Sequence, residues 1–234
     1  MQTELKQTSL FKTLAPALPV VMGYLPIGFA YGVLAINAGL TPFETIAMSV
    51  MVYAGSAQLM AVSLFAAGIN PFSIIATTFI VNLRHLLMSA SLAPSMQHWK
   101  KSQVAAFCFE LTDESFGVHS LRFAQGENDA GQTLAINLTC QLAWVAGTLL
   151  GALAGSLIQD VTPYALDYAL PAMFIALLVL QLKSRLHLAV AVFAGLLSLG
   201  LWLGQVTQWN VIIAAVLAAT LGAGVVTWTK QRSC

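Results

Sequence analysis

The chain has 234 residues, of which 58% are hydrophobic and only 8% are charged, and its formal net charge is +1. A soluble domain carries about 25% charged residues, so this chain has too few charges to cover a water-exposed surface. The composition excludes a soluble globular domain, a disordered chain and, because no basic face can form, a nucleic-acid-binding protein. The mean hydropathy of +0.80 predicts an integral membrane protein.

Apolar runs of roughly 20 residues are long enough to cross about 30 Å of hydrocarbon as a helix. Seven such runs follow one another, at 14–36, 45–67, 72–93, 132–158, 165–182, 186–204 and 210–229. They predict an all-α bundle of seven or eight transmembrane helices, forming a single polytopic membrane domain over residues 1–234.

The segment 104–121 decides between seven and eight spans. It begins VAAFCF and continues ELTDES, so Glu110, Asp113 and Glu114 fall within five residues. Such a helix cannot face lipid. It either crosses inside the bundle, as an eighth span, or forms a re-entrant or surface helix.

The distribution of Lys and Arg between loops leaves the topology of the first spans open. Eight spans with a cytoplasmic N-terminus place seven positive residues inside, against Lys100 and Lys101 outside. Seven spans with an external N-terminus also place seven inside, against Lys6 and Lys12. Both arrangements make the tail at 230–234 cytoplasmic. We favour eight spans, because Lys6 and Lys12 flank the first span directly; this gives a cytoplasmic tail at 1–13 and a polar loop at 122–131.

Arg84 is the strongest candidate for a functional residue. It lies in Asn82-Leu83-Arg84-His85, near the middle of the span 72–93. An arginine at mid-helix costs about 2.5–3.5 kcal/mol even on insertion scales, so it normally faces the bundle interior and has a partner. Arg84 either pairs with a carboxylate to join two helices or lines a substrate or ion path. Asn82 belongs to the same candidate path, and His85 either relays protons or makes an interhelical hydrogen bond.

The carboxylate partner of Arg84 must come from the acidic residues at membrane depth, which are Glu44, Glu110, Asp113, Glu114 and Asp167. Asp113 and Glu114 are flanked by apolar residues, and Asp167 begins a later span near Pro171. A carboxylate beside Arg84 would stay ionised, whereas one without a cation would tend to bind a proton, as proton-coupled transport requires. The alternative for Asp113 and Glu114 is a solvated helix end.

Proline, glycine and small polar residues interrupt the first two spans. Pro26-Ile27-Gly28 lies in the middle of the first span and predicts a broken helix, of the kind whose free backbone groups hold substrates in transporters. A kink without function is the alternative. Gly55, Ser56 and Gln58 form a polar patch midway along the second span, and Gln58 must face protein or water there.

Glycines recur at intervals of four residues, as in helix pairs whose backbones approach closely in lipid. The longest series is Gly147, Gly151 and Gly155. Two pairs repeat the spacing: Gly200 with Gly204, and Gly28 with Gly32. We expect these stripes either to pack helices within the chain or to dock a partner subunit.

Motifs for enzymatic chemistry and for metal binding are absent from the sequence. It contains no GxxxxGK[ST], HExxH or CxxC, and the residue after Ser56 is alanine rather than the glycine of a serine-hydrolase pattern. Cys108, Cys140 and Cys234 predict buried apolar positions rather than disulfides. We therefore expect no enzymatic activity, no metal and no cofactor.

Five segments in order resemble the AzlC-type family, the large subunits of bacterial branched-chain amino acid exporters. They are the proline- and glycine-containing first span, YAGSAQ, FIVNLRHLLMSASLAP, LTDESFG and LDYALPAMF, and the resemblance runs from about Leu14 to Leu182. It implies an inner-membrane permease for hydrophobic amino acids, a small membrane partner of the AzlD type, and secondary transport driven by protons. A carrier or channel for another small solute, and a membrane scaffold without transport, remain as alternatives.

Overall fold

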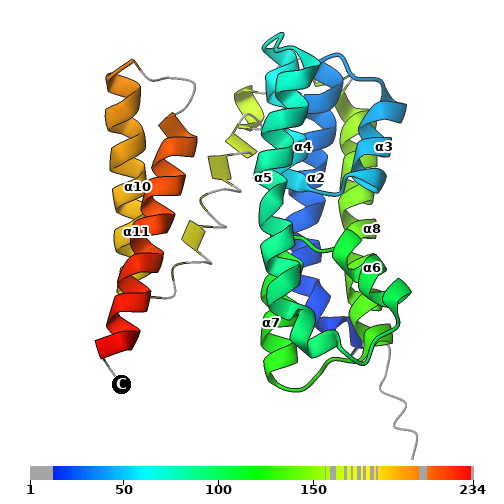
Figure 1. Ribbon diagram of the computed structural model, residues 1–234. Coiled ribbons are helices and arrows are strands. Elements are labelled where there is room, and N and C mark those ends of the chain that lie inside the picture. The colour runs from blue at the N-terminus through cyan, green and yellow to red at the C-terminus, as the bar shows by residue number, and fades with distance from the viewer. Residues whose placement is uncertain are drawn as a thin grey trace, which may run out of the picture. The chain divides into compact units, whose positions relative to one another are not determined.

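The computed structural model describes residues 13–155, 157–158, 162–165, 168–169, 171–172, 175, 178–179, 182, 184–205 and 210–232. Every regular element within these residues is a helix, which confirms the all-α prediction. The chain divides into two compact units, Met1–Met173 and Phe174–Cys234 (Figure 1). Asp167, Lys183 and most of the predicted span at 165–182 lie outside the described residues, as does the tail at 1–13 apart from Thr13.

Three long helices run the height of the first unit (Figure 1): α2 (Leu18–Asn37), α5 (Pro71–Leu92) and α8 (Ala130–Gly155). The short 3-10 helices η1 (Ala15–Ala17) and η2 (Ala93–Met96) extend α2 and α5. In the second unit, α10 (Arg185–Leu203) packs against α11 (Asn210–Arg232). Among the described helices, four are long and apolar enough to span a membrane, namely α2 and α5 with their extensions, α8 and α10. They match the predicted spans at 14–36, 72–93, 132–158 and 186–204.

The second predicted span, 45–67, is two helices rather than one. Helix α3 (Pro42–Met51) and helix α4 (Gly55–Ala66) are separated by Val52, Tyr53 and Ala54. A 12-residue helix is only about 18 Å long, too short to cross a bilayer. The pair folds back on itself, because Phe43 near the start of α3 and Phe65 near the end of α4 line the same groove. The chain therefore leaves this pair at the end of the bundle where it entered.

The doubtful segment 104–121 forms a second pair of the same kind. Helix α6 (Lys101–Phe109) and helix α7 (Asp113–Ala124) are again separated by three residues. The Phe107 ring lies 5.4 Å from the His119 ring and 6.1 Å from the Phe123 ring, so α7 returns alongside α6. Figure 1 shows the two pairs at opposite ends of the long helices. The predicted loop 122–131 is shorter than expected, because α7 continues to Ala124 and α8 begins at Ala130.

Glycines bring α2 and α8 into backbone contact over most of their length. A methyl group added to Gly28 would lie 2.8 Å from the Trp144 carbonyl oxygen, and one added to Gly32 would overlap the Thr148 carbonyl. On the other helix, Gly147, Gly151 and Gly155 face Leu25, Phe29 and Ile36 in the same order, so the two helices run parallel. In this structure these glycines therefore lie at a contact between two helices of the same chain.

The break expected at Pro26 is wrong. Helix α2 is continuous from Leu18 to Asn37, and Pro26 lies exposed on its surface. A proline inside a helix costs about 3 kcal/mol, mostly through the lost hydrogen bond. Because the opposite face of α2 is fixed along α8, the helix stays continuous past this residue.

The glycines predicted to pack in the second unit do not contact another helix among the described residues. A methyl group on Gly200 would meet nothing within 4 Å, and one on Gly204, which caps α10, would meet only the Gly200 and Leu201 carbonyl oxygens at 3.4 Å. The close approach between α10 and α11 involves instead Gly222, where a methyl group would lie 3.0 Å from Val190.

We expect Gly32→Ala to destabilise the protein by about 1–3 kcal/mol, because its methyl group would collide with backbone that cannot move aside. The matched control is Gly23→Ala on the same helix, where an added methyl group meets nothing within 4 Å. That variant should be neutral or slightly stabilising, since alanine favours helix by up to about 1 kcal/mol. Thermal unfolding of the two purified variants in detergent compares them, and equal melting temperatures would contradict the interface.

Candidate functional site

The tips of the two helical pairs meet between α2, α5 and α8. At the first tip, Tyr53 has a positive φ of 43°, a conformation in which a bulky side chain is strained. At the second tip, Thr112 caps α7 by accepting a hydrogen bond from the Ser115 backbone N–H. Two helix N-termini, at Gly55 and Asp113, therefore open at this place, and each carries a partial positive charge.

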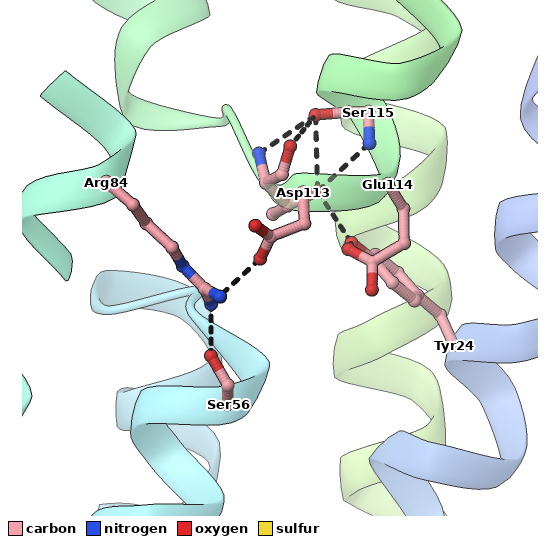
Figure 2. Close-up of polar contacts among 7 residues, drawn as sticks. Tyr24, Ser56, Arg84, Asp113, Glu114 and Ser115 are labelled. Atoms are coloured by element: carbon pink, nitrogen blue, oxygen red, sulfur yellow. Dashed lines mark hydrogen bonds and ion pairs between the residues drawn. The ribbon is translucent and has the colours of Figure 1, made fainter. Parts of the chain in front are cut away.

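Arg84 joins the two tips. One of its terminal nitrogens, Nη2, lies 2.8 Å from Asp113 Oδ2 at the start of α7. The same nitrogen donates a hydrogen bond to the Ser56 hydroxyl at the start of α4 (Figure 2). The side chain of Asp113 is 12% exposed and that of Arg84 is 27% exposed, so the pair is largely, but not fully, desolvated. The predicted need of Arg84 for a carboxylate partner is thus met by Asp113.

Glu114 points to the other side of the tip, toward α2 (Figure 2). The Tyr24 hydroxyl lies 2.7 Å from Glu114 Oε2, to which it can donate, and 2.6 Å from Thr112 Oγ1. Two adjacent carboxylates therefore have different partners. Asp113 contacts a guanidinium group, whereas the Glu114 carboxylate contacts a neutral phenol.

A cavity of about 20 Å³ lies between the tips. Its walls come from α2, from both tips and from α8, and they comprise Tyr24, Ile27, Tyr53, Gly55, Ser56, Thr112, Asp113, Glu114 and Trp144. A single water needs about 10–15 Å³, so the cavity admits one group of that size. The bundle is closed around its centre in this conformation.

A chain of buried polar side chains holds the first tip against α8. The Trp144 indole N–H donates to Gln58 Oε1 at 3.1 Å, and the Gln58 amide donates to Ser49 Oγ at 3.1 Å. Ser49 Oγ in turn lies 2.8 Å from Thr148 Oγ1. Gln58 and Ser49 are fully buried. Such a network fixes the position of α3 and α4, since each unmade hydrogen bond there would cost about 1–3 kcal/mol.

Of the residues predicted to line a substrate or ion path, the structure gathers five at the tips: Gly55, Ser56, Arg84, Asp113 and Glu114. Gln58 lies behind them in the polar chain. Gly28 packs on α8 and Pro26 faces outward, away from the tips. Asn82 and His85 lie on α5 beside Arg84 in sequence, both partly buried, and Asn82 Oδ1 has no hydrogen-bond partner within the described residues.

Four residues that line the cavity were not predicted as site residues: Tyr24, Tyr53, Thr112 and Trp144. The three aromatic residues lie in apolar runs, where they fit an ordinary helix interior equally well, and Thr112 lies in the acidic stretch ELTDES. Their polar atoms were the available signal, because a buried tyrosine or tryptophan normally has a hydrogen-bond partner. Within the part of the chain that the structure describes, no cluster of three His, Cys, Asp or Glu side chains could hold a metal ion.

The residues of this site lie within the part of the chain that matches a known protein family. Residues 19–158, from α2 to the end of α8, match the family described as AzlC protein. A membrane protein of uncharacterised function from Archaeoglobus fulgidus is 36% identical over 94% of this chain and 97% of its own length. The inner membrane protein YgaZ of Escherichia coli is 31% identical over 74% of each chain. The branched-chain amino acid transport protein AzlC of Bacillus subtilis is 30% identical over 88% of this chain and 80% of its own. No solved structure matches significantly.

Proposed function

The chain belongs to the AzlC family, and we propose that it is a secondary transporter exporting branched-chain or related hydrophobic amino acids. It is a multi-pass protein of the bacterial inner membrane, as its apolar helices and its relatives agree. The observation that supports transport most directly is the position of Arg84. A cation at the centre of an apolar bundle costs free energy, and residues of this kind within membrane spans typically mark a path for a polar solute or ion.

The tips supply complementary groups for an amino acid carboxylate. The Arg84 guanidinium has donors in a fixed fork, which suits a carboxylate, and the Ser56 hydroxyl and the N-terminus of α4 lie beside it. In the closed conformation, the Asp113 carboxylate forms an ion pair with the Arg84 guanidinium group. A substrate carboxylate would replace Asp113 as the partner of Arg84, while the apolar surroundings accept a branched side chain.

Proton coupling follows from the same exchange. Burial disfavours an ionised carboxyl group and a neighbouring cation favours it. When the substrate carboxylate replaces Asp113 as the partner of Arg84, Asp113 loses its neighbouring cation, and its protonated form becomes more favourable. Glu114, Tyr24, Tyr53, Glu110 and His85 are the other titratable groups near this exchange, and Glu114 is the second candidate carrier of the proton.

The two helical pairs also suggest a topology. If each pair returns to its own side, the crossings are α2, α5, α8, the predicted span 165–182, α10 and α11. Of the ten Lys and Arg residues, Arg84 lies within α5 and the other nine then fall on one side: Lys6, Lys12, Lys100, Lys101, Arg122, Lys183, Arg185, Lys230 and Arg232. The positive-inside rule makes this side cytoplasmic, with both tails inside. No arrangement of seven or eight full spans separates the charges so completely.

A partner subunit is also part of the proposal. The resemblance to branched-chain amino acid exporters implies a small membrane protein of the AzlD type. Its supporting observation is only that resemblance, and co-purification of the two proteins would decide it.

Transport is tested by Arg84→Ala in cells that depend on this protein for leucine efflux. We expect export to fall to the level of cells lacking the protein, because the substrate carboxylate loses its cation. Lys101→Ala, which removes a positive charge outside the bundle, should leave efflux unchanged at equal protein amount in the membrane. Normal leucine efflux with Arg84→Ala would refute the proposal.

Proton coupling is tested with valine-loaded vesicles containing the purified protein, with and without a protonophore. We expect collapse of the proton gradient to slow uphill valine movement by about tenfold or more, while exchange of labelled for unlabelled valine continues. Asp113→Asn should transport only downhill. Uphill transport that ignores the protonophore would show that protons are not the coupling ion.

The topology is tested with single cysteines in a chain freed of its three native ones, labelled by a membrane-impermeant maleimide in intact cells. Ala38→Cys and Ala67→Cys should be labelled from outside, whereas Lys100→Cys and Gln125→Cys should be labelled only after lysis. Eight full spans predict the opposite result at residues 67 and 100. Seven full spans predict that Ala38→Cys is protected in intact cells.

A further inference from the structure

The cavity between the helix tips has the character of a small cation site. Its lining includes two carboxylates, Asp113 and Glu114, and no Lys, Arg or His. Arg84 satisfies Asp113 from outside the cavity, which leaves Glu114 as the carboxylate facing inward without a cation in contact. A carboxylate in such surroundings attracts a positive group.

A second observation points to a missing ligand. The Tyr53 side chain is 97% buried, since its relative exposure is 3%. It lines the cavity, yet its hydroxyl has no hydrogen-bond partner among the described residues. A buried hydroxyl without a partner costs about 1–3 kcal/mol. The cost falls on a residue whose backbone is already strained, with φ of 43°, and this combination is typical of a site that is completed by its ligand.

The size and the walls of the cavity identify the ligand group. At about 20 Å³ it holds one group no larger than a water molecule. A primary ammonium group fits this size, whereas a carboxylate or a branched side chain does not. Three walls are aromatic, from Tyr24, Tyr53 and Trp144, and aromatic rings attract organic cations.

We propose that this cavity is the subsite for the substrate's primary ammonium group, with Glu114 as the counter-ion and the Tyr53 hydroxyl as a hydrogen-bond acceptor. The carboxylate of the same zwitterion then reaches Arg84 and Ser56 on the other side of the tip. The protein therefore selects compounds with a free amine and rejects 2-hydroxy acids, 2-oxo acids and simple carboxylic acids of the same shape. The subsite deepens the proposed transport function and relies on it for the choice of leucine as the probe.

Direct binding separates this subsite from the transport proposal. Ligands that bind the folded protein raise its melting temperature. The full-length protein, purified in detergent, is titrated with L-leucine, with leucinamide, which keeps the amine, and with 4-methylpentanoate, which lacks it. We expect leucine and leucinamide to stabilise the protein and 4-methylpentanoate to bind at least about tenfold more weakly than leucine.

Two pairs of variants assign the effect to the named groups. Glu114→Gln should weaken binding of both amines about tenfold or more, while Glu110→Gln, a partly buried carboxyl group outside the cavity lining, should preserve the preference for amines. Tyr53→Phe should weaken amine binding severalfold. Its control is Tyr31→Phe, which removes a hydroxyl that contacts the Thr45 carbonyl oxygen and Met48 Sδ and leaves the ring stacked on Trp144.

Several outcomes would overturn the subsite. The cavity does not recognise the amine if 4-methylpentanoate and leucine stabilise the protein equally. The same conclusion follows if Glu114→Gln keeps the wild-type preference for amines. Stabilisation by sodium chloride but not choline chloride, lost in Glu114→Gln, would assign the cavity to a metal cation instead. If the amines bind as expected but leucine is not exported, the subsite stands and the transport proposal fails. If leucine is exported without any amine preference, transport stands and the subsite fails.

Discussion

The cost of placing one guanidinium group inside an apolar bundle governs how this protein is built. Arg84 lies on a long helix with hydrophobic residues along most of its length, and a lone charge there would be uphill by several kcal/mol. Its partners cannot come from the same helix, so two other segments must reach it. They do so as short helical pairs whose tips carry a hydroxyl, Ser56, and a carboxylate, Asp113. The breaks in these segments thus place polar groups where the charge needs them.

The rest of the first unit holds these tips in position. Glycines allow α2 and α8 to touch along their backbones, so the two helices form a firm support. Tyr24 and Trp144 extend from this support to the tips, and their rings lie 5.4 Å apart. The buried chain from Trp144 through Gln58 to Ser49 fixes the first pair, and the Tyr24 hydroxyl contacts the second. The result is an enclosed polar centre, with α2 and α8 on one side and the tips of the two helical pairs on the other.

Much of this could be predicted from the sequence, and the failures have physical causes. Long apolar runs such as 72–93 were identified correctly, because the length of a span is set by the bilayer and not by neighbours. Hydropathy reports only how apolar a run is, so it could not show that 45–67 turns back at Val52, Tyr53 and Ala54, none of which is a glycine or a proline. Tertiary packing turns the chain at residues 52–54 and keeps α2 helical through Pro26. Likewise, the sequence predicts that Arg84 needs a carboxylate partner. It does not show whether this partner is Asp113 or the adjacent Glu114, because that depends on the direction of each side chain in the folded structure.

The two helical pairs have a consequence for symmetry. Helices α3 and α6 have 10 and 9 residues, α4 and α7 have 12 each, and both pairs follow a long helix, α2 or α5, that runs in the opposite direction to its counterpart (Figure 1). This order of helices and their opposite directions are also found in transporters built from inverted repeats. Among the described helices, α8 follows the second pair and packs chiefly on α2. The polar centre is therefore contacted by one pair from each end of the long helices, and under the proposed transport function each pair would act on it from its own face of the membrane.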